Sequence, residues 1–518
     1  MKRRKGRFAL LSMLLAASML ASCSAPGGSP AASSPGAGSS GSGASQEEAG
    51  QEEKPVLKVL GYNASFDPNE DLMASEIEKV TGYQVEYYML PVENADEKLN
   101  IELSSGSKYD ILNLLSDQYF KIVGQGALLP LDDLLAEYGQ NILSAVKEET
   151  WKACEYDGSI YSIPLRKEYP KDVTEFILVR EDILEEIGEE IPTTLDEFYQ
   201  VLQAIKEKRP DLIPLTGPNS TEVMAGASGV LSPTINSAFG IYTDWQEVDG
   251  KLVNTLEHPR IQDSLSFMSR LYEEGLIDPD WPINTGTTIN EKFTSGKAVM
   301  TMCNRNTSTL LFPVIRENFP DAKLGYILPL IGENGEQGAR VEDNVVTYSC
   351  IPRTSEHAED AVKFMDLKQE PDNFLYLTLG EEGKHFTMED GQYIPIMPIF
   401  SDERTSAYWY LNSSDEENYP TMWMARVRKN DDMWDAFEKV SLACSDITKA
   451  NPLGYMPPNA EVSKYQQSLD KMANDFYLKV IAGAESLDSY GAFVQQWKEA
   501  GGDVLTEEIN AWYSEYYG

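Results

Sequence analysis

The sequence VLKVLGYNASFDPNEDLMASEIEKVTGYQVEYYMLPVENADEKLNIELSSGSKYDILNL, residues 56–114, predicts the fold class. It contains apolar or alternating runs that are typical of strands, separated by stretches with apolar residues at helical spacing. Gly82 follows the first helical stretch as its C-cap. The expected order is strand 56–61, helix 71–81, strand 84–90, helix 96–105 and strand 109–114. Strands that alternate with helices in this way indicate an α/β fold, a parallel sheet covered by helices.

Aromatic and polar residues follow two of these strands. Tyr62 comes directly after the first strand, and Asp117 and Gln118 come after the third. Ligands of α/β sheets bind beyond the carboxyl ends of the strands, so we expect these three side chains near a ligand. Carboxylate and amide groups exchange hydrogen bonds with polar ligands, and a tyrosine offers a flat apolar face. Asp117 could also cap the helix that begins there, and both roles remain open.

The rest of the chain is expected to be mainly helical towards its end. Thr193 or Thr194 is placed as the N-cap of a helix that continues to about Glu207. Further helices are expected at 259–275, 358–367, 433–442, 462–482 and 487–500. Trp497 and Trp512 have apolar neighbours at helical spacing, so we expect both to pack in the core.

The first 54 residues have the pattern of a secreted lipoprotein. A basic head precedes a largely apolar run, 8–21, that is too short to span a hydrocarbon core of about 30 Å and is typical of a signal peptide. Leu20-Ala21-Ser22-Cys23 resembles the lipobox of bacterial lipoproteins, in which the cysteine is acylated and becomes the new N-terminus. We expect a signal peptide at 1–22 and a lipid on Cys23. The Ser/Gly/Ala/Pro-rich segment 23–54 is expected to be a flexible tether that holds the body outside the cell, anchored to the cell membrane.

The composition excludes some classes of partner. A formal net charge of −40 argues against nucleic acid, because phosphate backbones require a basic surface. Hydrophobic residues make up 42% of the chain, too many for a disordered acidic protein. The cysteines after residue 23 form no CxxC pair, and we expect no metal or cofactor. Small buried core residues are the expected role of these cysteines, while a single disulfide remains open: Cys154, Cys303, Cys350 and Cys444.

Four segments of the body resemble the extracellular solute-binding proteins of bacterial ABC importers, in the family that includes the maltodextrin-binding proteins. They are EKVTG at 78–82, SGSKYDI at 105–111, PTTLDEF at 192–198 and FTSGKAVM at 293–300. Residues 377–391 and the helical C-terminal part further resemble a subgroup of long lipoproteins common in Gram-positive bacteria. The order and spacing of these segments extend the resemblance over the whole body of the chain.

This resemblance implies a periplasmic-binding-protein-like fold, with two α/β lobes joined by a hinge and the ligand held between them. The chain is expected to cross the hinge three times, near 165–174, 300–305 and 346–352. Lobe 1 is then 55–165 plus 300–347, and lobe 2 is 166–299 plus 348–518 with a helical C-terminal extension. Relatives in the subgroup often carry a calcium-loop-like insertion where this chain runs directly through 208–215, so no calcium is expected there.

The resemblance also implies positions for ligand-binding residues. Asn304, Arg305 and Asn306 follow the expected second crossing, where the family places cleft residues. Tyr169 lies at the first crossing. Trp409 and Trp423 lie in the C-terminal region that brings aromatic residues to the cleft in relatives. Together with Tyr62, Asp117 and Gln118, they form the predicted ligand site.

We therefore expect the chain to bind a carbohydrate, specifically an oligosaccharide, and to deliver it to the permease subunits of an ABC transporter. The protein is expected to be a lipid-anchored monomer. Sugars present hydroxyl groups and apolar faces, which match polar and aromatic side chains. A receptor for peptides or another polar solute on the same fold stays open. An extracellular glycan-degrading enzyme is the weaker alternative, because the three histidines, His258, His357 and His385, form no catalytic motif. The separation of a catalytic carboxylate pair cannot be obtained from one sequence.

Overall fold

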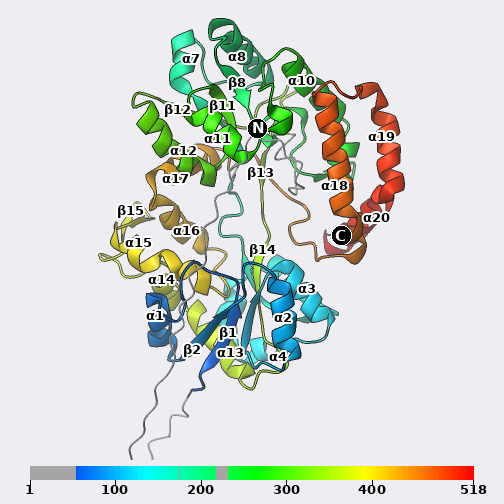
Figure 1. The fold of residues 1–518 in the computed structure, drawn as a ribbon. Helices are drawn as coiled ribbons and strands as arrows, with labels where there is room; N and C mark the ends of the chain where they lie inside the picture. Colours follow the sequence, from blue (N-terminus) through cyan, green and yellow to red (C-terminus); the bar gives the residue numbers. More distant parts are fainter. Residues whose placement is uncertain (1–53, 174, 218–231, 518) are drawn as a thin grey trace, which may run out of the picture. The chain divides into compact units, whose positions relative to one another are not determined.

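The computed structural model describes residues 54–173, 175–217 and 232–517. These residues form two α/β lobes, each built around its own sheet (Figure 1). Cys23, the expected signal peptide and nearly all of the expected tether lie outside the described residues. Lys54, expected at the end of the tether, contacts the body, since its Nζ donates a hydrogen bond of 2.7 Å to the carbonyl of Thr81.

The first sheet has five strands in the order β2-β1-β3-β14-β6. Their bounds are β1 (Leu57–Gly61), β2 (Val85–Met89), β3 (Ile111–Leu114), β6 (Ile163–Arg166) and β14 (Val345–Cys350). The three strands predicted from residues 56–114 are confirmed, and β1 pairs in parallel with both β2 and β3. Asp71 caps α1 (Leu72–Thr81) by accepting a hydrogen bond from Met73 N, and Gly82 ends that helix with a φ of 69°. The predicted glycine C-cap is confirmed, because glycine adopts this conformation without strain.

Helices cover both faces of the first sheet. β1 alternates between them, with Leu57 and Val59 in one buried cluster and Leu60 in another. α1, α4 (Asp132–Tyr138), α5 (Gln140–Ala145) and α13 (Ala358–Gln369) belong to the first cluster. α2 (Ala95–Ser104) and α3 (Ser116–Gly124) belong to the second.

The second sheet has four strands in the order β12-β7-β11-β8. They are β7 (Glu175–Arg180), β8 (Ile213–Thr216), β11 (Ala298–Asn304) and β12 (Leu324–Ile327). One face of the sheet is covered by α7 (Glu181–Ile187), α8 (Leu195–Lys208) and α10 (Ile261–Glu273). The other face is covered by α11 (Gly286–Thr294) and α12 (Arg305–Asn318). The predicted helices at α8 and α10 are confirmed. Thr194, rather than Thr193, caps α8, and Glu197 completes a capping box.

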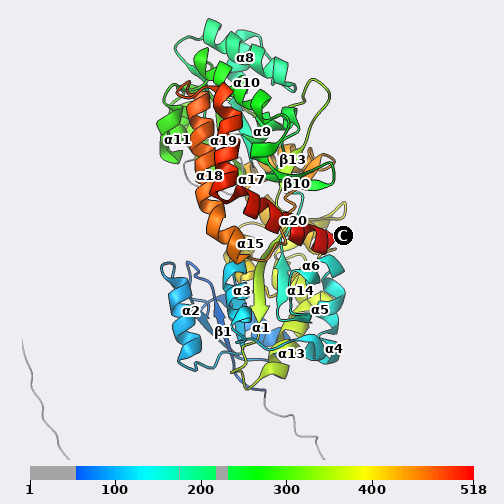
Figure 2. The ribbon, with the colours of Figure 1, turned by 90° about the vertical axis from the view of Figure 1, so that its right-hand side faces the viewer.

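Three C-terminal helices extend the second lobe. α18 (Ala460–Ile481) and α19 (Tyr490–Trp497) lie beside α10 (Figure 2), and the stacked rings of Phe476 and Phe493 join the two helices. Trp497 is buried among them, as predicted. α20 (Asp503–Tyr517) reaches the first lobe, where the Tyr516 hydroxyl donates a hydrogen bond of 2.8 Å to the carbonyl of Glu149. The C-terminal helices therefore contact both lobes.

Strand pairing corrects the expected lobe boundaries. The chain passes from the first sheet to the second between Arg166 and Glu175. Residues 300–347 were expected beside 55–165, but β11 and β12 pair with β7 in the second sheet. The chain returns only at β14, which joins the first sheet together with α13, although residues from 348 on were expected in lobe 2. An apolar strand pattern does not reveal which sheet the strand enters, because pairing partners are distant in sequence.

Further helices and strands connect these elements. They include α6 (Glu148–Lys152), β4 (Glu155–Tyr156), β5 (Ser159–Ile160), α9 (Pro233–Asn236), β9 (Trp245–Val248), β10 (Lys251–Asn254), β13 (Ala339–Val341), α14 (Pro371–Leu379), β15 (Phe386–Glu389), β16 (Gln392–Pro395), α15 (Ile399–Arg404), η4 (Thr405–Tyr410), α16 (Tyr419–Arg428), α17 (Asp431–Ala436) and β17 (Thr448–Ala450). β17 pairs with β13, so the chain is back at the second lobe after α16 and α17.

The four cysteines of the body are buried and free, which supports the prediction of small core residues and leaves no disulfide among them: Cys154, Cys303, Cys350 and Cys444. Burial raises the pKa of the Cys154 thiol to about 12, so the thiol stays protonated and unreactive at neutral pH. Among the described residues no group of three or more His, Cys, Asp or Glu side chains could hold a metal ion. No described helix is both long and apolar enough to cross a membrane.

Candidate functional site

A cleft of about 470 Å³ lies where segments of both lobes meet. The first lobe contributes the loop after β1, and the second contributes the start of α12. Glu168 comes from the connection between the sheets, and the remaining wall is formed by η4, α16 and α17. The lining residues are Tyr62, Ala64, Ser65, Phe66, Glu168, Arg305, Thr405, Ser406, Tyr408, Trp409, Trp423, Arg426, Val427, Lys429 and Met433.

Trp409 packs over the carboxyl end of β1 and forms one wall of this cleft. Gly61 ends the strand, and a Cβ at that position would lie 3.1 Å from the Trp409 ring, so the glycine allows the close approach. The indole Nε1 donates a hydrogen bond of 3.1 Å to the carbonyl of Tyr62. The rings of Tyr62 and Phe66 each lie 6.0 Å from the Trp409 ring between centroids. The first strand and its loop therefore present an aromatic surface to the cleft.

Lys368 stabilises the chain segment that follows Trp409. Its side chain lies buried on α13, and Nζ donates hydrogen bonds to the carbonyl of Tyr410 and, at 2.5 Å, to Oδ1 of Asn412. Among the described residues no carboxylate lies within 4 Å of this amine. Burial lowers the pKa of Lys368 to about 7, because desolvation disfavours the ammonium form.

A Lys368→Met substitution is expected to change how stability depends on pH. Between the folded pKa near 7 and the unfolded value of about 10.4, the unfolded chain binds a proton that the folded chain has released. The free energy of unfolding of the wild type should therefore rise with pH in this window, by about 1 kcal/mol relative to Lys368→Met between pH 7.5 and 8.5. Urea unfolding at both pH values measures the free energy of unfolding of each protein. Lys363→Met, on the same helix, is the control, and its free energy of unfolding should change with pH as that of the wild type does. If the free energy of unfolding changes equally with pH in both variants, the role of Lys368 is contradicted.

Trp423 on α16 forms the second aromatic wall. Its ring stacks on Tyr169, with centroids 6.0 Å apart and planes 6° from parallel. The Arg305 guanidinium lies 5.3 Å from the Trp423 ring, within the range of a cation–π contact. Arg305 forms a buried ion pair with Asp172, and its Nε has no hydrogen-bond partner. Burial raises the pKa of Asp172, although the charge of Arg305 opposes this shift.

Three cations and one carboxylate line the cleft. They are Arg305, Arg426, Lys429 and Glu168. Burial, together with the charge of Glu168, raises the pKa of Tyr62 to about 12, so its hydroxyl remains a hydrogen-bond donor at neutral pH. The arrangement combines flat aromatic faces with charged and hydroxyl groups, which suits a polar ligand that also has apolar faces.

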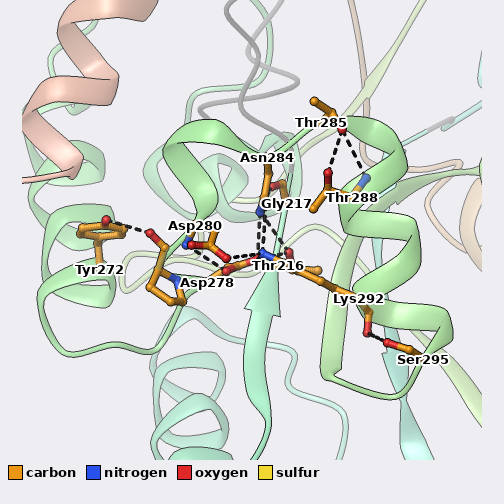
Figure 3. Close-up of polar contacts among 11 residues, drawn as sticks. Thr216, Gly217, Tyr272, Asp278, Asp280, Asn284, Thr285, Thr288, Lys292 and Ser295 are labelled. Atoms are coloured by element: carbon orange, nitrogen blue, oxygen red, sulfur yellow. Dashed lines mark hydrogen bonds and ion pairs between the residues drawn. The ribbon is translucent and has the colours of Figure 1, made fainter. Parts of the chain in front are cut away.

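A second polar cluster lies at the carboxyl end of β8 (Figure 3). Lys292 Nζ donates to Asp278 Oδ2 at 2.7 Å, to Asn284 Oδ1 at 3.0 Å and to Asp280 Oδ2 at 3.1 Å. The Thr216 hydroxyl donates a further hydrogen bond of 2.7 Å to Asp278 Oδ2. Burial opposes the ionisation of Asp278, but the hydrogen bonds from Lys292, Asn284 and Thr216 outweigh it and lower its pKa. Because Lys292 supplies the cation for these oxygens, the cluster stabilises the second lobe.

Comparison with known proteins identifies the family. The model of the bacterial extracellular solute-binding protein family matches residues 73–381, more than half of the chain. The chain belongs to this family. The polygalacturonan/rhamnogalacturonan-binding protein YtcQ of Bacillus subtilis (strain 168) is 24% identical to this solute-binding protein, over 85% of this chain and 88% of YtcQ. Lipoprotein LipO of the same organism is also 24% identical, over 84% of this chain and 88% of LipO.

A solved structure shows the same fold. The S. pneumoniae ABC-transporter substrate-binding protein FusA, in complex with kestose, superposes with a TM-score of 0.63 at 18% identity. The match covers 89% of this chain and 99% of FusA. The two α/β lobes of this solute-binding protein therefore have the periplasmic-binding-protein-like architecture that the resemblance predicted.

The structure brings four of the nine predicted ligand residues of this solute-binding protein to the cleft: Tyr62, Arg305, Trp409 and Trp423. Tyr169 supports the cleft from behind Trp423. The others have different positions: Asp117 is exposed in the first turn of α3, Gln118 is buried and hydrogen-bonded to Asp96, Asn304 caps α12 through Thr307 N, and Asn306 is exposed. These four residues do not line this cleft.

Sequence reasoning missed several cleft residues of this solute-binding protein. Arg426 follows Trp423 by three positions on α16, so helical spacing could have placed it on the same side. Glu168 adjoins Tyr169 in the predicted crossing. Phe66 and Lys429 carry no signal in the sequence beyond their residue types.

Proposed function

We propose that this solute-binding protein captures a carbohydrate, an oligosaccharide, in the cleft and delivers it to the permease subunits of an ABC transporter. The observation that carries the proposal is the pair of tryptophans, Trp409 and Trp423, in a cleft that also presents guanidinium, ammonium, carboxylate and hydroxyl groups. Indole faces pack against the C–H faces of sugar rings, while the polar groups bond to sugar hydroxyls.

Relatives support a saccharide ligand. YtcQ is named for binding polygalacturonan and rhamnogalacturonan, and FusA was solved with kestose. The partner is then an ABC permease, in keeping with the description of FusA as an ABC-transporter substrate-binding protein. The protein acts as a receptor without catalysis and without a cofactor or metal.

The body is held at the extracellular side of the cell membrane by a lipid on Cys23. The lipobox-like sequence Leu20-Ala21-Ser22-Cys23 and the relative named Lipoprotein LipO support this location. In the proposed arrangement the protein is a monomer that is attached to the membrane through Cys23.

Thermal unfolding of the purified protein with a panel of oligosaccharides tests the proposal. A ligand that binds only the folded state stabilises it by RT ln(1 + [L]/Kd), about 2.7 kcal/mol at a hundredfold excess over Kd. We expect at least one oligosaccharide to raise the unfolding temperature in this way. A shift with peptides and none with any saccharide would overturn the carbohydrate ligand. Chromatography of the bound sugar after incubation should recover it intact, and cleavage products would instead indicate an enzyme.

A further inference from the structure

The cleft has a positive charge although the whole chain is strongly acidic. Its lining holds Arg305, Arg426 and Lys429 but a single carboxylate, Glu168. The chain has 83 acidic residues against 43 Lys and Arg, so an arbitrary site would contain more acids than bases. The excess of cations at this cleft therefore requires a chemical reason.

Two of these four charges are compensated within the protein. Arg305 is paired with the buried carboxylate of Asp172. Glu168 Oε2 lies 3.6 Å from Nζ of Lys167. The uncompensated charge of the cleft therefore belongs to Arg426 and Lys429.

Arg426 is positioned by neutral groups only. Its Nη1 donates a hydrogen bond of 2.8 Å to the carbonyl of Arg404, and its Nη2 donates one of 2.8 Å to the carbonyl of Thr405. No carboxylate within the described ranges lies within 4 Å of this guanidinium. A guanidinium has five N–H donors, so Arg426 keeps donors and a full charge for a ligand.

Lys429 lies one turn farther along, at the end of α16. It is half-buried, and no described residue forms a hydrogen bond or an ion pair with its side-chain amine. Burial and the charge of Arg426 lower the pKa of Lys429. Two cations three residues apart repel each other, so this pair costs stability unless an anion binds between them.

We infer that the saccharide is acidic and that Arg426 and Lys429 bind a carboxylate on its ring, as in a uronic acid. This inference rests on the proposed function. Arginine matches the two oxygens of a carboxylate with parallel N–H donors, and the lysine adds a second charge. The partly dehydrated cleft strengthens both contacts relative to water. Trp423, which is backed by the stacked ring of Tyr169, then faces the sugar ring that carries the carboxylate.

Calorimetric titration with matched ligands tests the inference. The acidic probes are trigalacturonate, trimannuronate and an unsaturated hyaluronan tetrasaccharide, each compared with its methyl ester, and the neutral probes are kestose and maltotriose. We expect an acidic probe to bind at least tenfold more tightly than its methyl ester, because esterification removes the charge without changing the ring. Raising the salt concentration should weaken only the acidic probe.

Variants assign the charge to the two residues. Lys429→Gln removes a side chain that has no partner in the protein, and Arg426→Gln removes the guanidinium. Each should weaken binding of the acidic probe about 10- to 100-fold and leave the affinity for its methyl ester nearly unchanged. Arg426→Lys should retain part of the affinity. Lys251→Gln removes one charge from the exposed surface of β10 and is the control that should bind as the wild type does.

The outcomes separate this inference from the proposed function. Binding of neutral oligosaccharides with equal or higher affinity would overturn the acidic ligand and leave the carbohydrate receptor intact. Acidic binding that is unaffected by both variants would overturn the role of Arg426 and Lys429. Failure of all saccharides, neutral and acidic, would overturn both proposals.

Discussion

A Trp423→Ala substitution is expected to weaken saccharide binding about 30-fold or more. The indole is 8% exposed and lines the cleft in which we propose that the saccharide binds. Losing a buried aromatic anchor from a binding site commonly costs about 2 kcal/mol or more of binding free energy, which corresponds to this factor. Isothermal titration with the saccharide that stabilises the wild type measures the change.

Trp434→Ala is the matched control for Trp423→Ala. Trp434 lies on the next helix, under the Arg428 guanidinium at 3.7 Å, and does not line the cleft. Both substitutions remove an indole from the same apolar cluster, so both should lower the unfolding temperature. Only Trp423→Ala should also lower affinity. Equal loss of affinity in the two variants would show that the cluster, not the cleft wall, is responsible.

A Lys292→Met substitution is expected to lower the free energy of unfolding by about 3–5 kcal/mol. The Asp278 carboxylate is 1% exposed, and Lys292 is its cationic partner at 2.7 Å. Without the ammonium, a buried negative charge remains among neutral donors, which is the costly outcome of breaking a buried ion pair. Chemical denaturation at pH 7 measures the loss.

Two further variants test the origin of this loss. Lys297→Met removes an exposed lysine five positions away and should change the free energy of unfolding by about 0.5 kcal/mol or less. The double variant Lys292→Met with Asp278→Asn should recover part of the loss, because no unpaired buried charge remains. A double variant as unstable as the sum of the two single changes would contradict the coupling.

Local features of the fold could be predicted from the sequence because their causes are local. Gly82 ends α1, and Thr194, one of the two predicted N-caps, begins α8, because these residues act on backbone groups a few positions away. The strands β1, β2 and β3 could likewise be predicted, because short apolar or alternating runs mark them in the sequence.

The lobe boundaries could not be predicted because sheet membership depends on distant partners. The run Ala298–Asn304 is apolar enough to be a buried strand in either sheet. Its pairing with β7, more than a hundred residues earlier, decides that it belongs to the second lobe. The same holds for β14, which joins β3 and β6.

The sequence by itself determined that this chain is an α/β protein, and its family resemblance predicted aromatic residues near the ligand. The tertiary structure decided which of them share a cleft: Trp409 through its contact with Gly61 and Tyr62, and Trp423 through Tyr169 and Arg305. It also decided the charge of that cleft. A cationic side chain contributes to the net charge of the chain wherever it lies. Its effect on a ligand depends on whether a nearby carboxylate compensates its charge, and only folding brings such partners together.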